Sequence, residues 1–207
     1  MTIAIIKCPS SNFLSLQNAV DELGIEYITV KKPKDLKSVS KIILPGVGNF
    51  KYVASFLKKT NLMSAINKQV QMGVPYLGIC IGMQLMCNYS TEGGSKTNGF
   101  GWVNGHVEEL NSNSNYFNVP NMGWEKILWK ENKIFHKNRI DYDTFYFCHS
   151  YHAVKIKNEV FAKTISDKEI IASLKYKNAI GVQFHPEKSG NKGLKFIEDF
   201  LLWDVNK

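Results

Sequence analysis

Arginine is almost absent from this chain of 207 residues, in which Arg139 is the only one. Lysine therefore supplies nearly all of the 26 basic residues and of the formal net charge of +8, and it is scattered along the chain. Because lysine lacks the planar fork with which arginine binds phosphates and bases, this composition argues against a nucleic-acid-binding protein. We expect the charge to serve solubility and the weak steering of an anionic partner or substrate.

Cysteine is scarce as well, and no long apolar run is present. Cys8, Cys80, Cys87 and Cys148 show no C-x-x-C spacing, which argues against a zinc site or a disulfide framework and for a reducing compartment. No window approaches the roughly 20 apolar residues of a membrane span, and the apolar part of residues 1–7 is too short for a signal peptide. The sequence therefore predicts a cytoplasmic protein that has no membrane partner, no metal ion and no cofactor.

The first 80 residues alternate between strand and helix patterns, which is typical of a doubly wound parallel sheet. The apolar strand-like runs and the helical patterns follow one another as strand 3–6, helix 13–23, strand 27–30, strand 41–44, helices 52–58 and 62–72, and strand 74–77. A chain of this length usually forms one domain with a substantial core. We therefore expect residues 1–207 to form a single α/β domain around an open, mostly parallel sheet flanked by helices, with a flavodoxin-like core.

The second half of the chain has a different pattern, with short strand-like pieces in place of the alternation. These pieces are residues 102–107, 126–129, 144–148 and 170–174. We expect them to form antiparallel strands, added to the parallel core or lying beside it. Residues 194–203 carry an apolar stripe at helical spacing, so a final helix should pack on the sheet.

Residues 78–82, Gly-Ile-Cys-Ile-Gly, are the first of two segments that point to catalysis. They lie between an apolar run and a helical pattern, so the chain should turn sharply from strand into helix with Cys80 at the bend. This is the nucleophile-elbow arrangement with sulfur in place of oxygen. Gly78 and Gly82 would allow the tight turn, and the following helix N-terminus would favour a thiolate. A lone cysteine in such a place is more often a core residue, so a base is needed.

The second segment, residues 183–187, supplies that base. Pro186 should end a buried strand and leave His185 at its tip, where Glu187 can hold the far nitrogen of the imidazole. Cys80, His185 and Glu187 are therefore the predicted catalytic triad.

The backbone near the thiol supplies candidate donors to the oxyanion that forms when a thiolate attacks a carbonyl. Residues 45–48, Pro-Gly-Val-Gly, also follow a predicted strand, and such strand ends gather at one edge of an open sheet. We expect the backbone N–H groups of Ile81 and of Val47 or Gly48 to donate to the oxyanion. Without the cysteine, the Pro-Gly pair would be read as an ordinary turn.

Residues 77–84 and 181–187 together resemble the class I (triad) glutamine amidotransferases. Within that family, residues 44–50, 119–124 and 147–151 resemble the glutaminase subunit of imidazole glycerol phosphate synthase. The resemblance implies that Cys80 attacks the carboxamide of glutamine and forms a thioester. His185 would then protonate the departing ammonia and activate water, and glutamate would be released.

The same resemblance assigns further residues by matching position. Those implied to bind glutamine are Gly46, Gln84, Glu92, His149, Ser150 and Tyr151. Glu92 has a physical motive, since a carboxylate can pair with the substrate ammonium, although a solvated loop residue fits the sequence equally well. Those implied to meet a (β/α)8-barrel cyclase are Pro120, Met122, Trp124, Tyr146 and Lys188. Because this chain has no second domain that could use ammonia, the resemblance implies a heterodimer with that cyclase, and glutaminase activity that the cyclase's ligand switches on through residues 45–48.

Two departures from the family pattern leave the partner open. Residues 7–12 keep only the asparagine of a segment that usually carries an acidic residue, a tyrosine and glycines, and Glu125 replaces a common asparagine. A paralogous subunit that supplies ammonia for amidino groups on bacterial surface sugars is the alternative interpretation. A catalytically silent regulatory subunit and a stand-alone hydrolase of γ-glutamyl substrates are further ones.

Overall fold

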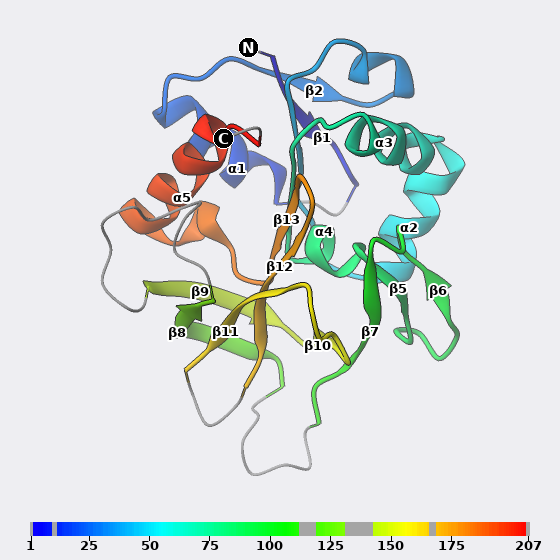
Figure 1. The fold of residues 1–207 in the computed structure, drawn as a ribbon, viewed down its shortest axis with the longest axis vertical. Coiled ribbons are helices and arrows are strands. Elements are labelled where there is room, and N and C mark those ends of the chain that lie inside the picture. The colour runs from blue at the N-terminus through cyan, green and yellow to red at the C-terminus, as the bar shows by residue number, and fades with distance from the viewer. Residues whose placement is uncertain (1, 10–11, 112–118, 131–142, 166–168, 206–207) are drawn as a thin grey trace.

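The structure is a computed structural model that describes residues 2–9, 12–111, 119–130, 143–165 and 169–205. Arg139 and residues 10 and 11 of the atypical segment therefore lie outside the described residues. The described chain forms a nine-stranded sheet, a four-stranded sheet and flanking helices (Figure 1). No helix of the described part is long and apolar enough to cross a membrane.

Five parallel strands form one half of the large sheet. In spatial order they are β2 (Tyr27–Val30), β1 (Ile3–Ile6), β3 (Lys41–Leu44), β4 (Tyr76–Ile79) and β13 (Ala179–Val182). All of them but β2, which lies at the edge of the sheet, are buried along their whole length, because helices cover both faces. In Figure 1, α1 (Phe13–Glu22) and α5 (Gly190–Leu202) lie on one side of these strands, and α2 (Phe50–Lys59) and α3 (Leu62–Gln71) on the other.

Four antiparallel strands continue the same sheet beyond β13. They are β12 (Ile171–Tyr176), β11 (Val160–Thr164), β8 (Asn121–Trp129) and β9 (Asp143–His149). In β8 and β9 the burial pattern alternates, so one face packs on the core and the other is open. Phe145, Phe184 and Phe196 pack together on the core side, with 4.0 Å between the ring centroids of the first two. This cluster joins β9 to the end of β13 and to α5.

The second sheet lies beside the parallel core. Its order is β10 (Tyr151–Val154), β7 (Val103–Glu109), β5 (Cys87–Ser90) and β6 (Thr97–Asn98). Three short helical segments complete the chain: α4 (Ile81–Gln84) and the 3-10 turns η1 (Pro33–Leu36) and η2 (Pro186–Lys188). The predicted α/β architecture is confirmed, including strands both added to the parallel core and lying beside it.

Candidate active site

Cys80 lies at a sharp bend between β4 and α4. Its backbone has φ +52° and ψ −102°, a left-handed conformation that costs free energy for any residue with a side chain. The Cys80 N–H donates to the carbonyl of Val182 on β13, 2.7 Å away, and so fixes the bend to the sheet. A Cβ at Gly78 would collide with the carbonyl of Gly82, and one at Gly82 with that of Leu44. The predicted elbow is present because these glycines allow close approach of the backbones.

The helix after the elbow is much shorter than the sequence suggests. α4 ends at Gln84, and β5 begins at Cys87. A single turn has only a small macrodipole, since that dipole is the sum of aligned peptide units. Stabilisation of a thiolate at Cys80 therefore has to come mainly from side chains.

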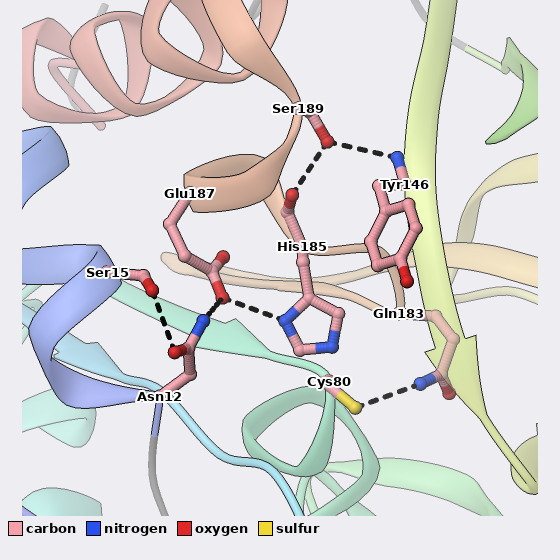
Figure 2. A network of polar contacts seen from close by, with 8 residues as sticks. All are labelled: Asn12, Ser15, Cys80, Tyr146, Gln183, His185, Glu187 and Ser189. Carbon is pink, nitrogen blue, oxygen red and sulfur yellow. Dashed lines mark hydrogen bonds and ion pairs between the residues drawn. The ribbon is translucent and has the colours of Figure 1, made fainter. Parts of the chain in front are cut away.

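His185 and Glu187 follow β13, and their side chains contact each other beside Cys80. His185 Nδ1 lies 2.8 Å from Glu187 Oε1, and both side chains are only 1% exposed. Figure 2 shows the imidazole between Glu187 and Cys80, with its second nitrogen on the side of the sulfur. The structure thus brings the three predicted triad residues together at the carboxyl ends of β4 and β13.

Charge at this site favours a protonated imidazole. Burial by itself lowers the pKa of His185, but the negative charge and hydrogen bonding of Cys80, together with Glu187, raise that pKa to about 10. At neutral pH His185 is therefore an imidazolium, placed between Glu187 and Cys80. In this form it can donate a proton to a leaving group.

Three residues that sequence reasoning did not assign hold the triad in place. Asn12 Nδ2 donates to Glu187 Oε1 at 3.1 Å, and Ser15 Oγ in turn donates to Asn12 Oδ1 at 2.8 Å (Figure 2). Ser189 Oγ donates to the His185 carbonyl at 2.6 Å. No local signal could have found the contact of Asn12 with Glu187, because these residues are separated by 175 positions.

A cavity of about 300 Å³ opens beside the sulfur. It is lined by Val47, Gly48, Cys80, Ile81, Gln84, Glu92, Pro120, Cys148, His149, Ser150 and Tyr151. Most residues that the sequence comparison with the family assigned to substrate binding and to the oxyanion donors therefore surround one space. The volume lies at the lower end of small-molecule sites, which suits a ligand the size of an amino acid.

Gln84, which lines this cavity, has one acceptor without a partner in the described part of the chain. Its Nε2 donates to the Tyr151 carbonyl at 2.9 Å and to Gln183 Oε1 at 3.1 Å. Its Oε1 is buried and has no hydrogen-bond partner among the described residues. A buried polar atom without a partner is costly, so this oxygen suits a ligand donor such as an ammonium group.

Glu92 is tied to the start of α2 and is not a freely solvated loop residue. Its Oε2 accepts from the Phe50 N–H at 2.6 Å, and its own N–H donates to Ser90 Oγ at 3.1 Å. Burial raises the pKa of Glu92, against the opposing hydrogen bonds from Phe50 and Asn49. A cation close to Glu92 would lower this pKa again and so favour the charged carboxylate.

His149 contributes through its neighbours. Its Nδ1 lies 3.0 Å from the Tyr151 carbonyl and its Nε2 lies 3.3 Å from Asn121 Nδ2, so both ring nitrogens are already engaged. Burial lowers the pKa of His149 to about 3, and the ring is neutral. The carbonyl of Tyr151 can only accept, so Nδ1 carries the proton and Nε2 accepts from Asn121. His149 therefore orients the Tyr151 backbone in the cavity wall.

This buried imidazole predicts a loss of stability in mild acid. As pH falls from 6.5 toward 3, the unfolded chain takes up a proton at His149 that the folded chain does not, so the free energy of unfolding drops by about 1.4 kcal/mol per pH unit. His185 is protonated in both states only well below pH 6.5, but its contribution is the same in the wild type and in a His149 variant and cancels in the comparison. Urea unfolding of the wild type and of His149→Gln at pH 6.5 and 5.0 measures the effect. The variant should lose about 2 kcal/mol less between the two pH values, and equal losses would contradict the assignment.

The predicted oxyanion donors are near the sulfur, but one of them is engaged. The Ile81 N–H points to the Gly46 carbonyl at 3.5 Å, the upper limit of a hydrogen bond. Val47 and Gly48 line the cavity, and Gly48 has a φ of +98°, which glycine adopts readily. A small reorientation of the Gly46 peptide would free the Ile81 donor.

The residues matched to a cyclase interface lie on β8, β9 and η2, with Pro120 directly before β8. We call this set the docking surface, because a partner is predicted to bind there; it consists of Pro120, Met122, Trp124, Tyr146 and Lys188. Met122 and Trp124 are 60% and 58% exposed. The rings of Trp124 and Tyr146 meet edge to face across β8 and β9, with 6.0 Å between centroids. Pro120 also lines the cavity, so the docking surface reaches its mouth.

The described part of the chain holds no group of three or more His, Cys, Asp or Glu side chains that could bind a metal ion. The site as described offers a thiol, an imidazolium, a carboxylate and backbone N–H groups around a small cavity. This set is suited to acyl transfer through a thioester.

Comparison with known proteins places this site in a family. Residues 4–203 match the family described as "Glutamine amidotransferase class-I". The chain is 36% identical to imidazole glycerol phosphate synthase subunit HisH 2 of Methanococcus maripaludis over 96% of this chain and 98% of that protein. It is 39% identical to subunit HisH 2 of Vibrio vulnificus over 98% and 95%. Among solved structures it is similar to PurLQS from Thermotoga maritima, with a TM-score of 0.75, 21% identity and 97% coverage of both chains.

Proposed function

Because this chain belongs to the class I glutamine amidotransferases, we propose that it is the glutaminase subunit of an imidazole glycerol phosphate synthase. It hydrolyses glutamine to glutamate and ammonia, and the ammonia serves histidine biosynthesis. The observation that carries the proposal is the buried pair of His185 and Glu187 at Cys80, beside a cavity whose mouth borders the docking surface.

The first half of the reaction forms the thioester. The sulfur of Cys80 attacks the side-chain carboxamide carbon of glutamine, and the carbonyl oxygen becomes an oxyanion. Backbone N–H groups of Ile81 and of Val47 or Gly48 stabilise that charge. The imidazolium of His185 then gives its proton to the nitrogen, the C–N bond breaks and ammonia leaves.

The second half of the reaction releases glutamate. His185, now neutral, takes a proton from water, and the hydroxide attacks the thioester carbon. The C–S bond breaks with its electron pair on sulfur, which restores the ion pair of Cys80 and His185. Glu187 holds Nδ1–H throughout, and so keeps the ring in the tautomer that presents Nε2 to the reacting atoms.

The amino-acid end of glutamine is held by the far wall of the cavity. The α-ammonium donates to the free Oε1 of Gln84 and pairs with Glu92. Ser150 and Tyr151 lie where the α-carboxylate would reach, and His149 fixes the Tyr151 backbone. Gly46 is placed to act through the Ile81 donor that its carbonyl engages.

A barrel cyclase is the proposed partner. Ammonia released into bulk water would be protonated and lost as a nucleophile, so its acceptor has to sit against the cavity. The docking surface supports this arrangement, since Pro120 belongs to both. The partner's ligand is proposed to act on residues 45–48, where rotation of one peptide would free the Ile81 N–H.

Glutamate release tests this function directly. Three samples are compared: the chain alone, the chain with a barrel cyclase from the same genome, and both with the cyclase's ribonucleotide substrate. Strong activation in the last sample alone supports the histidine-pathway subunit and its coupling. Glutamine hydrolysis that does not respond to that cyclase would still support the glutaminase reaction. It would contradict the proposed partner and favour one that builds amidino groups on surface sugars.

Truncation of an exposed apolar side chain tests the docking surface. Met122→Ala should weaken binding to the cyclase about tenfold, because well-packed apolar anchors at interfaces commonly contribute that much. Met72, at the end of α3, is 68% exposed, so Met72→Ala is a matched control that should leave the affinity unchanged. Titration calorimetry with the cyclase measures both. Equal affinities of the two variants would place the interface elsewhere.

A further inference from the structure

We infer that Gln183 is a further catalytic residue, whose side-chain amide donates a hydrogen bond to the sulfur of Cys80. Gln183 Nε2 lies 3.5 Å from Cys80 Sγ, within range for a sulfur acceptor (Figure 2). The inference rests on the proposed function for the reaction it serves, while the contact itself is a property of the folded chain. A chain of hydrogen bonds leaves the Gln183 amide only one possible orientation.

The backbone carbonyl of Tyr151 fixes the orientation of the Gln183 amide. It acts through Gln84, which is hydrogen-bonded to both. The Tyr151 carbonyl can only accept, so Gln84 has to turn its NH₂ group toward it at 2.9 Å. The second hydrogen of that NH₂ group then points to Gln183 Oε1 at 3.1 Å. Because Gln183 uses its oxygen there, its own NH₂ group faces the sulfur. The donor at Cys80 is therefore determined by the network and does not depend on how a single amide is drawn.

Burial gives the contact its strength. Gln183 is fully buried, and it follows β13 and precedes Phe184 in a run that is otherwise apolar. An amide in such a place is unfavourable unless both its ends are hydrogen-bonded, and here both are. In a site of low dielectric constant, an N–H donated to a charged acceptor stabilises that acceptor more than it would in water.

The contact acts at a defined point of the reaction. Before attack, the amide and the imidazolium of His185 together hold the negative sulfur in place. During hydrolysis of the thioester, the C–S bond breaks and the electron pair returns to sulfur, where the Gln183 N–H receives the developing charge. Loss of this donor should therefore slow the release of glutamate more than it weakens the binding of glutamine.

The same network links the substrate to the nucleophile. Gln84 has given both amide hydrogens to the protein, so the substrate ammonium can only approach its Oε1. A donor at that oxygen polarises the amide and strengthens the N–H groups on its other end. Occupation of the cavity thus strengthens the hydrogen bonds that orient Gln183 toward the sulfur.

The variant Gln183→Met tests the proposal, because methionine has a similar length and no donor. Alkylation of Cys80 by iodoacetamide should move to higher pH and slow about tenfold at pH 7. In the activated complex, kcat for glutamine hydrolysis should fall about 10- to 100-fold with KM little changed. Gln17→Met is the matched control, since Gln17 is a partly buried glutamine on α1 that donates to Tyr27 far from the sulfur. An unchanged pH profile of alkylation in Gln183→Met would overturn the proposal.

A second measurement needs no variant. The side-chain amide NMR signals of Gln183 in the wild type should shift with pH along the same profile as alkylation, while those of Gln17 should not. Absence of that shift would also overturn the proposal, even if Gln183→Met failed to fold. The pH profiles of alkylation and of the NMR signals depend on the Cys80 thiol alone, so they test this inference separately from the proposed function. The proposed function fails if the wild type releases no glutamate with any partner.

Discussion

A Cys80→Ala variant should release no measurable glutamate from glutamine, a loss of about 10⁶-fold, because no other group can form the thioester. The cyclase bound to this variant should still make its product from added ammonium salt at the wild-type rate. The two results together would separate the production of ammonia from its use. Coupled assays of glutamate release and of product formation, run on the same complex, measure them.

Cys87→Ala is the matched control for this prediction. Cys87 is also fully buried, lies close by on β5, and burial raises the pKa of its thiol to about 12. A thiol of that kind is not a nucleophile near neutral pH, so this variant should retain glutamine hydrolysis. Glutamate release that survives in Cys80→Ala and disappears in Cys87→Ala would show that the nucleophile has been assigned to the wrong cysteine.

Glu187→Gln should lower kcat for glutamine hydrolysis by about 10³- to 10⁴-fold and leave KM nearly unchanged. Glu187 Oε1 accepts from both His185 Nδ1 and Asn12 Nδ2, and an amide cannot accept from both with the same strength. The variant also removes one of the charges that raise the pKa of His185, so the imidazolium loses stability. The ring would then be free to adopt the wrong tautomer and to move away from the sulfur.

The pH dependence distinguishes this effect from a loss of folding. Cys80 and, to a smaller extent, Glu187 raise the pKa of His185 to about 10, so in Glu187→Gln the ring should lose its proton at lower pH. The alkaline limb of the glutaminase profile should move to lower pH accordingly. Glu198→Gln removes a carboxylate from the exposed pair with Lys195 on α5 and serves as the control. A loss of less than tenfold in Glu187→Gln would contradict the role assigned to Glu187.

The sequence was sufficient to predict that Cys80, His185 and Glu187 lie together, because each of the two segments that carry them has a local signature. Gly78 and Gly82 mark a turn where the backbones of β4 and α4 come within contact distance, and that requirement can be read from the residue types alone. Pro186 likewise marks the end of a strand. The parallel half of the sheet was predictable for the same reason, since its strands are continuous apolar runs that alternate with helical patterns.

The parts that were not predictable depend on contacts between distant segments. Strands β5, β6, β10 and β11 span only two to five residues each, so their pairing partners and not their own periodicity make them strands. The shortness of α4 follows from β5, which takes up the chain three residues after it. The engagement of both nitrogens of His149, and of both ends of the Gln183 amide, becomes visible only when the elements have been assembled.

The way β9 holds the catalytic base has a bearing on how such subunits change partners. His185 N–H donates to the carbonyl of Tyr146, and the N–H of Tyr146 donates to Ser189 Oγ, so the strand supports the base with its main chain alone. The Tyr146 ring meets that of Trp124, which also belongs to the docking surface. Any residue at position 146 except proline would offer the same N–H and carbonyl. Over evolution, the docking side chains can therefore be exchanged without disturbing the base, and one glutaminase can be adapted to a new ammonia acceptor.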